Sequence, residues 1–398
     1  MQPERGQAGK YRRIERRLCY NWLGMLERIH IDNYKCLTNF DLRLDNLTLL
    51  AGANGCGKSA VFEVVDKLRD FARDTRVERL FLADELTRWT TKKDQRFELE
   101  FSTGDGVFLY KLDIEYKTGR RKGAEIEGEH LLYDGKPVFS HSDRELKLYR
   151  DDGKELTYPF GRFRSALATE TDERLHSRLH RFRDLVCRFQ TLSLAPSVIV
   201  SGSKAESDVL ARDGANFAAW YRGQILNDPH QLRTVTERLS EILPGFAGLK
   251  LSARTGDYRE LLATFSSEGD GTSRSYRFDQ LSDGQRALMV LYSLVFETTP
   301  DTGLPGDYPD SPRTLFLDEP DNYVTLPELQ PWLAELEDGA GDTLPQVVLI
   351  SHHPEAIDFL AHNTVWLARE PESHTRIVDP KNDTGLRMSE VHARGWTP

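Results

Sequence analysis

The sequence has few cysteines, no long apolar run and no excess of positive charge. Its four cysteines, Cys19, Cys36, Cys56 and Cys187, form no CxxC pair and have no histidine at metal-ligand spacing. This argues against a zinc site and a disulfide framework and favours a reducing, cytoplasmic compartment. No stretch approaches the roughly 20 apolar residues of a membrane-spanning helix. A net charge of -10 does not suit a protein that coats nucleic acid over its whole surface.

The distribution of apolar residues predicts an α/β protein. Residues 97–150 alternate apolar and polar side chains between Gly and Asp turns, which is typical of antiparallel strands. Residues 165–245 are predicted to be mostly helical. The runs Thr314–Leu317 and Val347–Ile350 are almost continuously apolar, which suits central strands of a sheet covered on both faces. With 398 residues and no internal repeat, the chain is long enough for two or three units.

A phosphate-binding loop is predicted between a strand and a helix. Leu47–Ala51 is a short apolar strand, and apolar residues recur at helical spacing from Val61 to Ala72. The pattern GxxxxGK[ST] lies between them, formed by Gly52, Ala53, Asn54, Gly55, Cys56, Gly57, Lys58 and Ser59, with Ala60 next in the helix. In such a loop backbone N–H groups surround the phosphates, Lys58 reaches the β- and γ-phosphates, and Ser59 helps to hold Mg²⁺. The alternative is a glycine-rich turn with a solvated lysine.

Two carboxylates follow the apolar run Thr314–Leu317. Asp318 and Glu319 stand at the carboxyl end of the predicted strand, where a Mg²⁺ ligand and a water-activating base are needed. We predict Asp318 as the metal ligand and Glu319 as the general base. Taken alone, the pair also fits a strand that ends in an acidic turn.

A further anion site is predicted at the start of the apolar helix 287–296. The pentapeptide before it consists of Leu281, Ser282, Asp283, Gly284 and Gln285. Ser282 and the backbone of Gly284 would therefore lie at the positively polarised N-terminus of that helix. An ordinary N-cap is the alternative.

A histidine pair follows the apolar run Val347–Ile350. His352 and His353 come directly after Ser351, and a histidine at a strand end can hydrogen-bond a γ-phosphate or orient the attacking water. We predict His352 as the catalytic histidine, with His353 as its neighbour and competitor for that role. A satisfied surface histidine is the alternative.

Taken in order, the segments GANGCGKS, LSDGQ, TLFLDEPD and ISHHPE resemble the motifs of the ABC-type ATPase heads of the SMC, RecF and OLD group. The resemblance covers residues 25–105 and 260–370. It implies a P-loop head with an antiparallel β lobe and a mainly helical lobe. The corresponding parts would be a basic N-terminal arm over 1–24, an ATPase core over 25–160 and 260–398, and a mainly helical insert, the second lobe, over 161–259.

The resemblance also implies how the site works. Two protomers would pack head to tail and trap two ATP molecules with Mg²⁺, so that ATP closes the dimer and hydrolysis reopens it. One protomer would supply Lys58, Ser59, Asp318, Glu319 and His352. Its partner would supply the signature pentapeptide, with Ser282 and Gly284 on the γ-phosphate. Asp321 and Asn322 would form a loop that crosses the interface, and Gln95 is the candidate for the lobe-linking glutamine.

Three differences from this group reduce the number of possible functions. A segment of 221 residues separates Ser59 from Leu281, and no membrane-coupling segment is recognisable, which argues against a transporter subunit. The same segment lacks the sustained heptads of SMC arms. Only 46 residues follow His352, too few for the metal-dependent TOPRIM nuclease domain of OLD proteins, so we expect any nuclease to be another polypeptide. Compact heads of this kind resemble ATPase subunits of bacterial antiphage systems.

Three functions remain open at this point. The first is an ATPase that controls a separate effector, a TOPRIM-like nuclease or a toxin, in antiphage defence. The second is a RecF-like repair clamp that ATP loads onto double-stranded DNA and hydrolysis releases. The third is an ATP-bound scaffold that sequesters a toxic partner. The segment Arg174–Arg188, with five Arg and two His against Asp184, fits a DNA-binding helix and a solvated helix face equally well.

Overall fold

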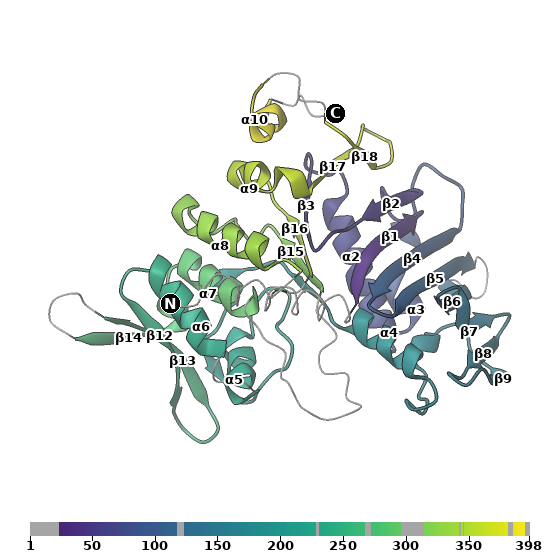
Figure 1. The fold of residues 1–398 in the computed structure, drawn as a ribbon, viewed down its shortest axis with the longest axis horizontal. Coiled ribbons are helices and arrows are strands. Elements are labelled where there is room, and N and C mark those ends of the chain that lie inside the picture. The colour runs from purple at the N-terminus through teal and green to yellow at the C-terminus, as the bar shows by residue number, and fades with distance from the viewer. Residues whose placement is uncertain are drawn as a thin grey trace, which may run out of the picture.

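A computed structural model describes residues 24–117, 123–227, 231–266, 272–295, 314–341, 344, 346–380 and 385–394. The arm predicted over residues 1–24 therefore lies outside the described residues, apart from Gly24. A central, mostly parallel sheet separates an antiparallel β lobe from a lobe of helices with a smaller sheet (Figure 1). This arrangement confirms the predicted α/β class with its antiparallel β lobe. No helix in the described ranges has the length and apolar character needed to span a membrane.

The central sheet places the phosphate-loop strand beside the predicted apolar strands. Its parallel strands are, in spatial order, β10 (Phe189–Leu192), β15 (Thr314–Asp318), β16 (Gln346–Ile350), β3 (Leu47–Ala51) and β17 (Thr364–Ala368), and β18 (Arg376–Val378) pairs antiparallel with β17. The predictions for β3, β15 and β16 are confirmed. The mostly helical prediction for 165–245 is wrong at β10, a fully buried strand that forms one edge of the sheet beside β15.

Alternation along these strands builds two hydrophobic cores, one on each face of the sheet. Leu50, Phe316 and Val348 face the core shared with the β lobe. Leu49 and Leu317 face the core shared with the helices of the other lobe. Successive side chains of a strand point to opposite faces, so a continuously apolar strand is what a doubly covered sheet requires.

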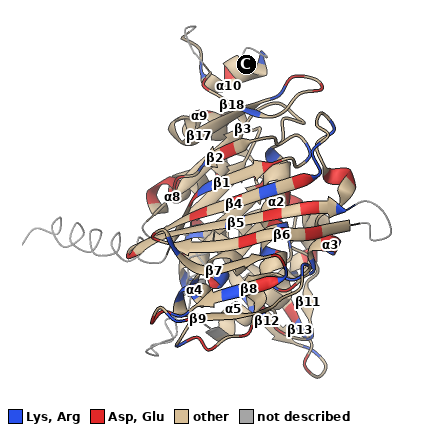
Figure 2. Ribbon diagram, turned by 90° about the vertical axis from the view of Figure 1, so that its right-hand side faces the viewer, with Lys and Arg blue, Asp and Glu red and all other residues tan. Residues whose placement is uncertain are grey.

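The β lobe is an eight-stranded antiparallel sheet that packs on helix α2 (Lys58–Ala72). Its spatial order is β2 (Phe40–Arg43), β1 (Met25–Asp32), β4 (Asp94–Thr103), β5 (Gly106–Lys117), β6 (Gly123–Tyr133), β7 (Lys136–Ser142), β8 (Glu145–Tyr149) and β9 (Glu155–Pro159). Charged residues of both signs line these strands (Figure 2), for example Arg28 between Asp41 and Glu98. Such cross-strand pairs stabilise an exposed sheet face. Helices α3 (Val77–Leu80) and α4 (Ser177–Cys187) belong to the same core.

The second lobe combines helices with a small antiparallel sheet. The sheet contains β11 (Gly202–Ser203), β12 (Phe246–Ala253), β13 (Arg259–Ser266) and β14 (Ser273–Arg277), and the helices are α5 (Phe217–Asn227), α6 (Gln231–Ile242), α7 (Asp283–Val295), α8 (Leu326–Gly339), α9 (Pro354–Phe359) and α10 (Met388–Ala393). The predicted boundary at residue 260 falls within the paired hairpin β12–β13. A domain boundary at residue 260 is therefore wrong, because it would divide the hydrogen-bonded strands β12 and β13.

Candidate active site

The predicted motifs meet at the carboxyl ends of three neighbouring parallel strands. β16 lies between β15 and β3, so the segments that follow these strands leave the sheet at the same edge. The phosphate loop follows β3, Glu319 follows β15, and His352 follows β16. The order of motifs in the sequence, in which the phosphate loop lies more than 200 residues before Glu319 and His352, does not reveal this proximity.

The phosphate loop depends on glycines that carry left-handed or otherwise positive φ angles. Gly52, Gly55 and Gly57 have φ of 145°, 77° and 108°. A Cβ at Gly52 would stand 2.1 Å from the carbonyl oxygen of Leu367, and one at Gly57 would stand 2.6 Å from Thr375 Oγ1. Only glycine fits such close approaches. The segment around β17 and β18 thus packs directly against the loop. The loop motif alone does not indicate this contact.

Lys58 is folded into the loop and lies near both predicted acids. Its Nζ donates to the carbonyl oxygens of Gly52 at 2.7 Å and Ala53 at 3.1 Å, and the residue is 5% exposed. Burial lowers its pKa, an effect opposed by several neighbours, including Glu319 and Asp318. A cation held this deep is short of compensating negative charge, which phosphate groups would supply.

Glu319 is held in a defined position by its backbone and two side chains. Its φ of 48° is uncommon for a residue with a side chain, and its N–H donates to the carbonyl of Ile350 at 2.9 Å. Asn322 Nδ2 donates to one carboxylate oxygen at 2.7 Å, and His352 Nε2 lies 3.6 Å from the other. Unusual backbone angles of this kind cluster at functional sites.

His352 and His353 make different contacts. Burial is the main cause that lowers the pKa of His352, and Lys58 adds to it while Glu319 opposes it. His352 is therefore mostly neutral at pH 7. His353 caps helix α9, where its Nδ1 accepts from the N–H of Glu355 at 3.2 Å. Of the two histidines, His352 is the one that faces Glu319.

Asp318 is accompanied by an arginine, Arg212, that no sequence motif indicates. Burial and the like charge of Glu319 raise the pKa of Asp318, while Arg212 and Lys58 act in the opposite direction. Arg212 Nη2 lies 4.0 Å from Asp318 Oδ2, and its Nη1 lies 3.1 Å from Asp66 Oδ2 on α2. The N–H of Ser193, directly after β10, donates to the carbonyl of Arg212 at 2.7 Å. Arg212 reaches the site because β10 joins the sheet.

Two predicted site residues are engaged elsewhere in the chain. Gln95 is 1% exposed. Its Nε2 donates to Asn33 O at 2.9 Å, and its Oε1 accepts from Tyr116 OH at 2.7 Å. Asp321 is 6% exposed and accepts from Ser351 Oγ at 2.9 Å. Gln95 is therefore corrected to a structural residue of the β lobe. Asp321 is corrected to a buried link between the loops after β15 and β16, because its carboxylate does not reach the surface.

The predicted signature segment begins helix α7. Ser282 Oγ accepts from the N–H of Gln285 at 3.3 Å, and Gln285 Oε1 accepts from the N–H of Ser282 at 3.2 Å, which is a capping box. A Cβ at Gly284 would stand 2.7 Å from the carbonyl oxygen of Tyr323. Leu281 is buried, whereas Ser282 and Asp283 are exposed. The N-cap interpretation is thus correct for the isolated chain, and Ser282 remains open to contact another molecule.

A hollow of about 710 Å³ lies beside the phosphate loop. It is lined by Lys35, Cys36, Asp84, Leu86, Arg88, Trp89, Arg369 and Glu372. Arg369 Nη1 donates to the carbonyl of Gly55 at 2.9 Å, and its guanidinium lies 5.0 Å from the centre of the Trp89 ring. Trp89 is 42% exposed. No sequence pattern indicates this stack, because Trp89 and Arg369 are remote in the chain and match no motif.

The basic segment Arg174–Arg188 uses its charges largely within the chain. Arg181 pairs with Asp105 at 2.6 Å, Arg178 lies 4.0 Å from Asp151, and Arg183 contacts His180 at 3.0 Å. Arg178 also lies over the ring of Tyr133. These contacts favour the interpretation of α4 as a structural helix over that of a DNA-binding helix.

The residues at this edge fit ATP and Mg²⁺. The first N–H groups of a helix lack intrahelical partners, and here α2 begins at Lys58, directly after the positive-φ loop. Ser59 and Asp318 offer the hydroxyl and carboxylate oxygens that Mg²⁺ prefers, with phosphates completing its ligands. Burial, with the like charge of Glu319 second, raises the pKa of Asp318, and a divalent cation beside this carboxylate would favour its ionised form.

Comparison with known proteins agrees with this geometry. Residues 47–358 match the model of the family AAA_21, described as "AAA domain, putative AbiEii toxin, Type IV TA system". An OLD nuclease from Thermus scotoductus is 26% identical over 156 residues, which are 39% of this chain. The aligned part spans only 26% of that protein's length.

Similar solved structures include two SMC heads. The SMC head domain from Thermotoga maritima has a TM-score of 0.45 at 14% identity, over 89% of this chain and 99% of that one. An SMC head bound to the C-winged helix domain of ScpA has a TM-score of 0.42 at 13% identity, over 92% and 99%. The family match covers most of the chain and includes the phosphate loop, Asp318, Glu319 and His352. The chain therefore belongs to the AAA_21 family of AAA domains.

Proposed function

We propose that the protein hydrolyses ATP with Mg²⁺ and passes its nucleotide state to a partner. The single observation that carries this proposal is the meeting of Lys58, Asp318, Glu319 and His352 at one sheet edge, with His352 Nε2 3.6 Å from Glu319. Lys58 would bind the β- and γ-phosphates. Ser59 and Asp318 would hold Mg²⁺, which supplies charge neutralisation for the phosphates. Steady-state phosphate release by the purified chain tests the proposal, and no ATP-dependent release above buffer would refute it.

Glu319 would act on the attacking water, and His352 would act on the γ-phosphate. The Glu319 carboxylate would accept the water proton, because Asn322 occupies one of its oxygens and leaves the other near His352. His352, neutral at pH 7, would donate a hydrogen bond to the γ-phosphate through one ring nitrogen. This role requires the tautomer that carries the proton on that nitrogen.

The adenine base would lie in the hollow beside Gly55, against the Trp89–Arg369 stack. We expect Trp89→Ala to weaken ATP binding about tenfold, because base stacking on an aromatic ring contributes roughly 1 to 3 kcal/mol. Equilibrium dialysis with ATP measures the effect, and Trp89→Phe should largely restore binding. Inorganic tripolyphosphate, which has no base, should bind Trp89→Ala and the unchanged protein equally. A loss that is the same for both ligands would contradict the placement of the base.

Dimerisation through the signature segment would complete the site. Ser282 is exposed at the start of α7 and can approach the γ-phosphate bound to a second protomer. In Ser282→Arg we expect turnover to fall about 100-fold, because the long cation would obstruct the closed interface. ATP binding to the monomer should change less than about twofold. Normal turnover in Ser282→Arg would exclude the signature role, and Ser275→Arg, on exposed β14, is the matched control.

The partner would be an effector encoded as a separate chain. Two findings support this part of the proposal: a relative that matches 156 residues of this chain is named OLD nuclease, and the family description names a toxin. A TOPRIM-like nuclease or a toxin, held or released according to the nucleotide state, would place the protein in antiphage defence. Co-purification that changes between ATP and ADP tests this step.

A further inference from the structure

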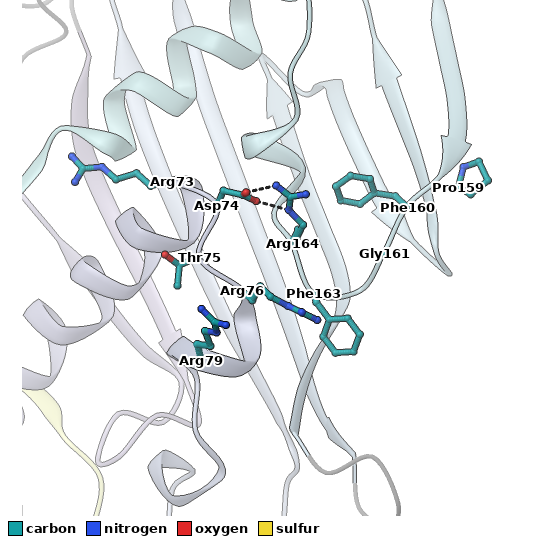
Figure 3. A pocket seen from close by; sticks show the side chains of 10 residues that line it. All are labelled: Arg73, Asp74, Thr75, Arg76, Arg79, Pro159, Phe160, Gly161, Phe163 and Arg164. Atoms are coloured by element: carbon teal, nitrogen blue, oxygen red, sulfur yellow. Dashed lines mark hydrogen bonds and ion pairs between the residues drawn. The ribbon is translucent and has the colours of Figure 1, made fainter.

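A basic hollow lies away from the ATP site, at the far end of α2. It has a volume of about 800 Å³ and lies between the segments 73–79 and 159–164 (Figure 3). Its lining includes Arg73, Arg76, Arg79, Phe160, Phe163 and Arg164. A second hollow of about 750 Å³ shares Arg73, Phe160 and Arg164 with it and adds Arg183. The two volumes are within the range of small-ligand pockets.

The positive charge of this hollow is only partly compensated. Arg164 is neutralised by a two-point pair with Asp74. Arg73 donates to the carbonyl of Cys187, which carries no charge. Arg76 has a solvent-exposed pair with Glu78 at 3.2 Å, and Arg79 makes no ion pair within the described chain. In a protein with a net charge of -10, gathered guanidinium groups of this kind favour an anion with several oxygens.

Aromatic rings accompany these cations. The Arg76 guanidinium lies 5.1 Å from the centre of the Phe163 ring. Phe160 is half-buried, with the ring of His141 at 5.0 Å against it. Planar side chains beside guanidinium groups are the elements with which proteins hold a nucleobase next to its phosphate.

The hollow is preformed by backbone hydrogen bonds. The carbonyl of Phe163 accepts from Val77 N–H at 3.0 Å, the carbonyl of Arg162 accepts from Ile126 N–H at 2.9 Å, and Phe160 N–H donates to Arg144 O at 2.8 Å. These bonds join the loop 159–164 to α3 and the β lobe. A ligand would therefore meet walls that are already in place, which lowers the entropy lost on binding.

We propose that this hollow binds a nucleoside 5′-phosphate, either a free nucleotide or the 5′-phosphorylated end of a strand. The phosphate lies against Arg79 and Arg76, and the base lies against the aromatic side. The site is distinct from the ATP site, since α2 separates them by 15 residues, or about 22 Å of helix. The same helix carries Lys58 at its first turn, so the two sites share one rigid element.

Calorimetric titration of the full chain without ATP tests the site. The probes are thymidine 5′-monophosphate, thymidine, inorganic phosphate and hexathymidylate with and without a 5′-phosphate. We expect Arg79→Ala to weaken binding of the monophosphate about tenfold, because a charge-assisted contact is lost. Arg233→Ala, which removes an equal charge at an 81% exposed position on α6, should change it by less than about twofold. Lys58→Ala should bind the monophosphate as the unchanged protein does, so a failure of this proposal is separable from a failure of the ATP site.

Two comparisons identify the source of the ligand. Tighter binding of the phosphorylated hexamer than of the monophosphate, with the same dependence on Arg79, assigns the site to strand ends. Equal or weaker binding of the hexamer assigns it to free nucleotides. The proposal is overturned if Arg79→Ala and Arg233→Ala bind alike, if inorganic phosphate or thymidine binds as tightly as the monophosphate, or if no probe binds at millimolar concentration.

Discussion

Glu319→Gln is expected to lower ATP turnover at least 100-fold while ATP binding persists, and to accumulate as an ATP-bound dimer. The amide keeps the size of the side chain and can still accept from Asn322 Nδ2, now 2.7 Å from the carboxylate. It has no basicity with which to take a proton from water, and a general base contributes roughly 10²- to 10⁴-fold to a rate. Phosphate release, equilibrium ATP binding and light scattering measure the three effects.

A control variant that loses one carboxylate elsewhere distinguishes the loss of the general base from a general effect of charge. Glu337→Gln alters a half-exposed side chain on α8 that pairs with His362, and turnover should stay within about twofold. Glu319→Gln that remains monomeric with saturating ATP and Mg²⁺ would argue against the head-to-tail dimer. Undiminished turnover in Glu319→Gln would remove Glu319 as the base.

Lys58→Ala is expected to weaken ATP binding by at least 100-fold. Lys58 is 5% exposed and its ammonium is held by the carbonyls of Gly52 and Ala53, so its contacts to phosphate would form in a site largely shielded from water. Two charge-assisted hydrogen bonds at roughly 1.5 to 3 kcal/mol each correspond to a loss of about 100-fold or more. Binding of a fluorescent ATP analogue, with circular dichroism to verify folding, measures this loss.

The control for Lys58→Ala is an equal loss of charge elsewhere. Lys204→Ala changes an exposed lysine of the second lobe and should bind ATP like the unchanged protein. If ATP binding in Lys58→Ala fell by less than about fivefold, the loop 52–59 would have to be reinterpreted as a structural turn.

Local sequence patterns predicted the strands that matter most for the site. β3, β15 and β16 are short, apolar and bounded by turns, and their ends carry residues whose chemistry is specific. The alternating residues 97–150 likewise predicted the β lobe, because a half-exposed sheet imposes a period of two on the sequence. Such strands can be recognised from their own residues, and long-range pairing decides only which strands lie next to them.

Other predictions failed where the decisive contacts are long-range. Phe189–Leu192 was predicted as part of a helical region, yet β15, 125 residues later, gives it a partner and makes it a strand. Gln95 was predicted as a nucleotide contact, but its amide is satisfied by Asn33 and Tyr116. Asp321 was predicted at an interface, but it is buried against Ser351. In each case the side chain or segment contacts residues that are distant in the sequence, so the residues next to it in the chain do not predict the contact.

The sequence by itself determined the chemistry available to this protein, since the phosphate loop, the two acids and the histidine are recognisable from residue type and spacing. The tertiary structure alone decided which of these groups meet. The parallel order β15, β16, β3 brings Glu319 to His352, and the position of β10 brings Arg212 to Asp318. The physical reason is that hydrogen bonding between strands is set by the burial of whole faces, which depends on the complete chain, whereas a motif depends only on its own residues.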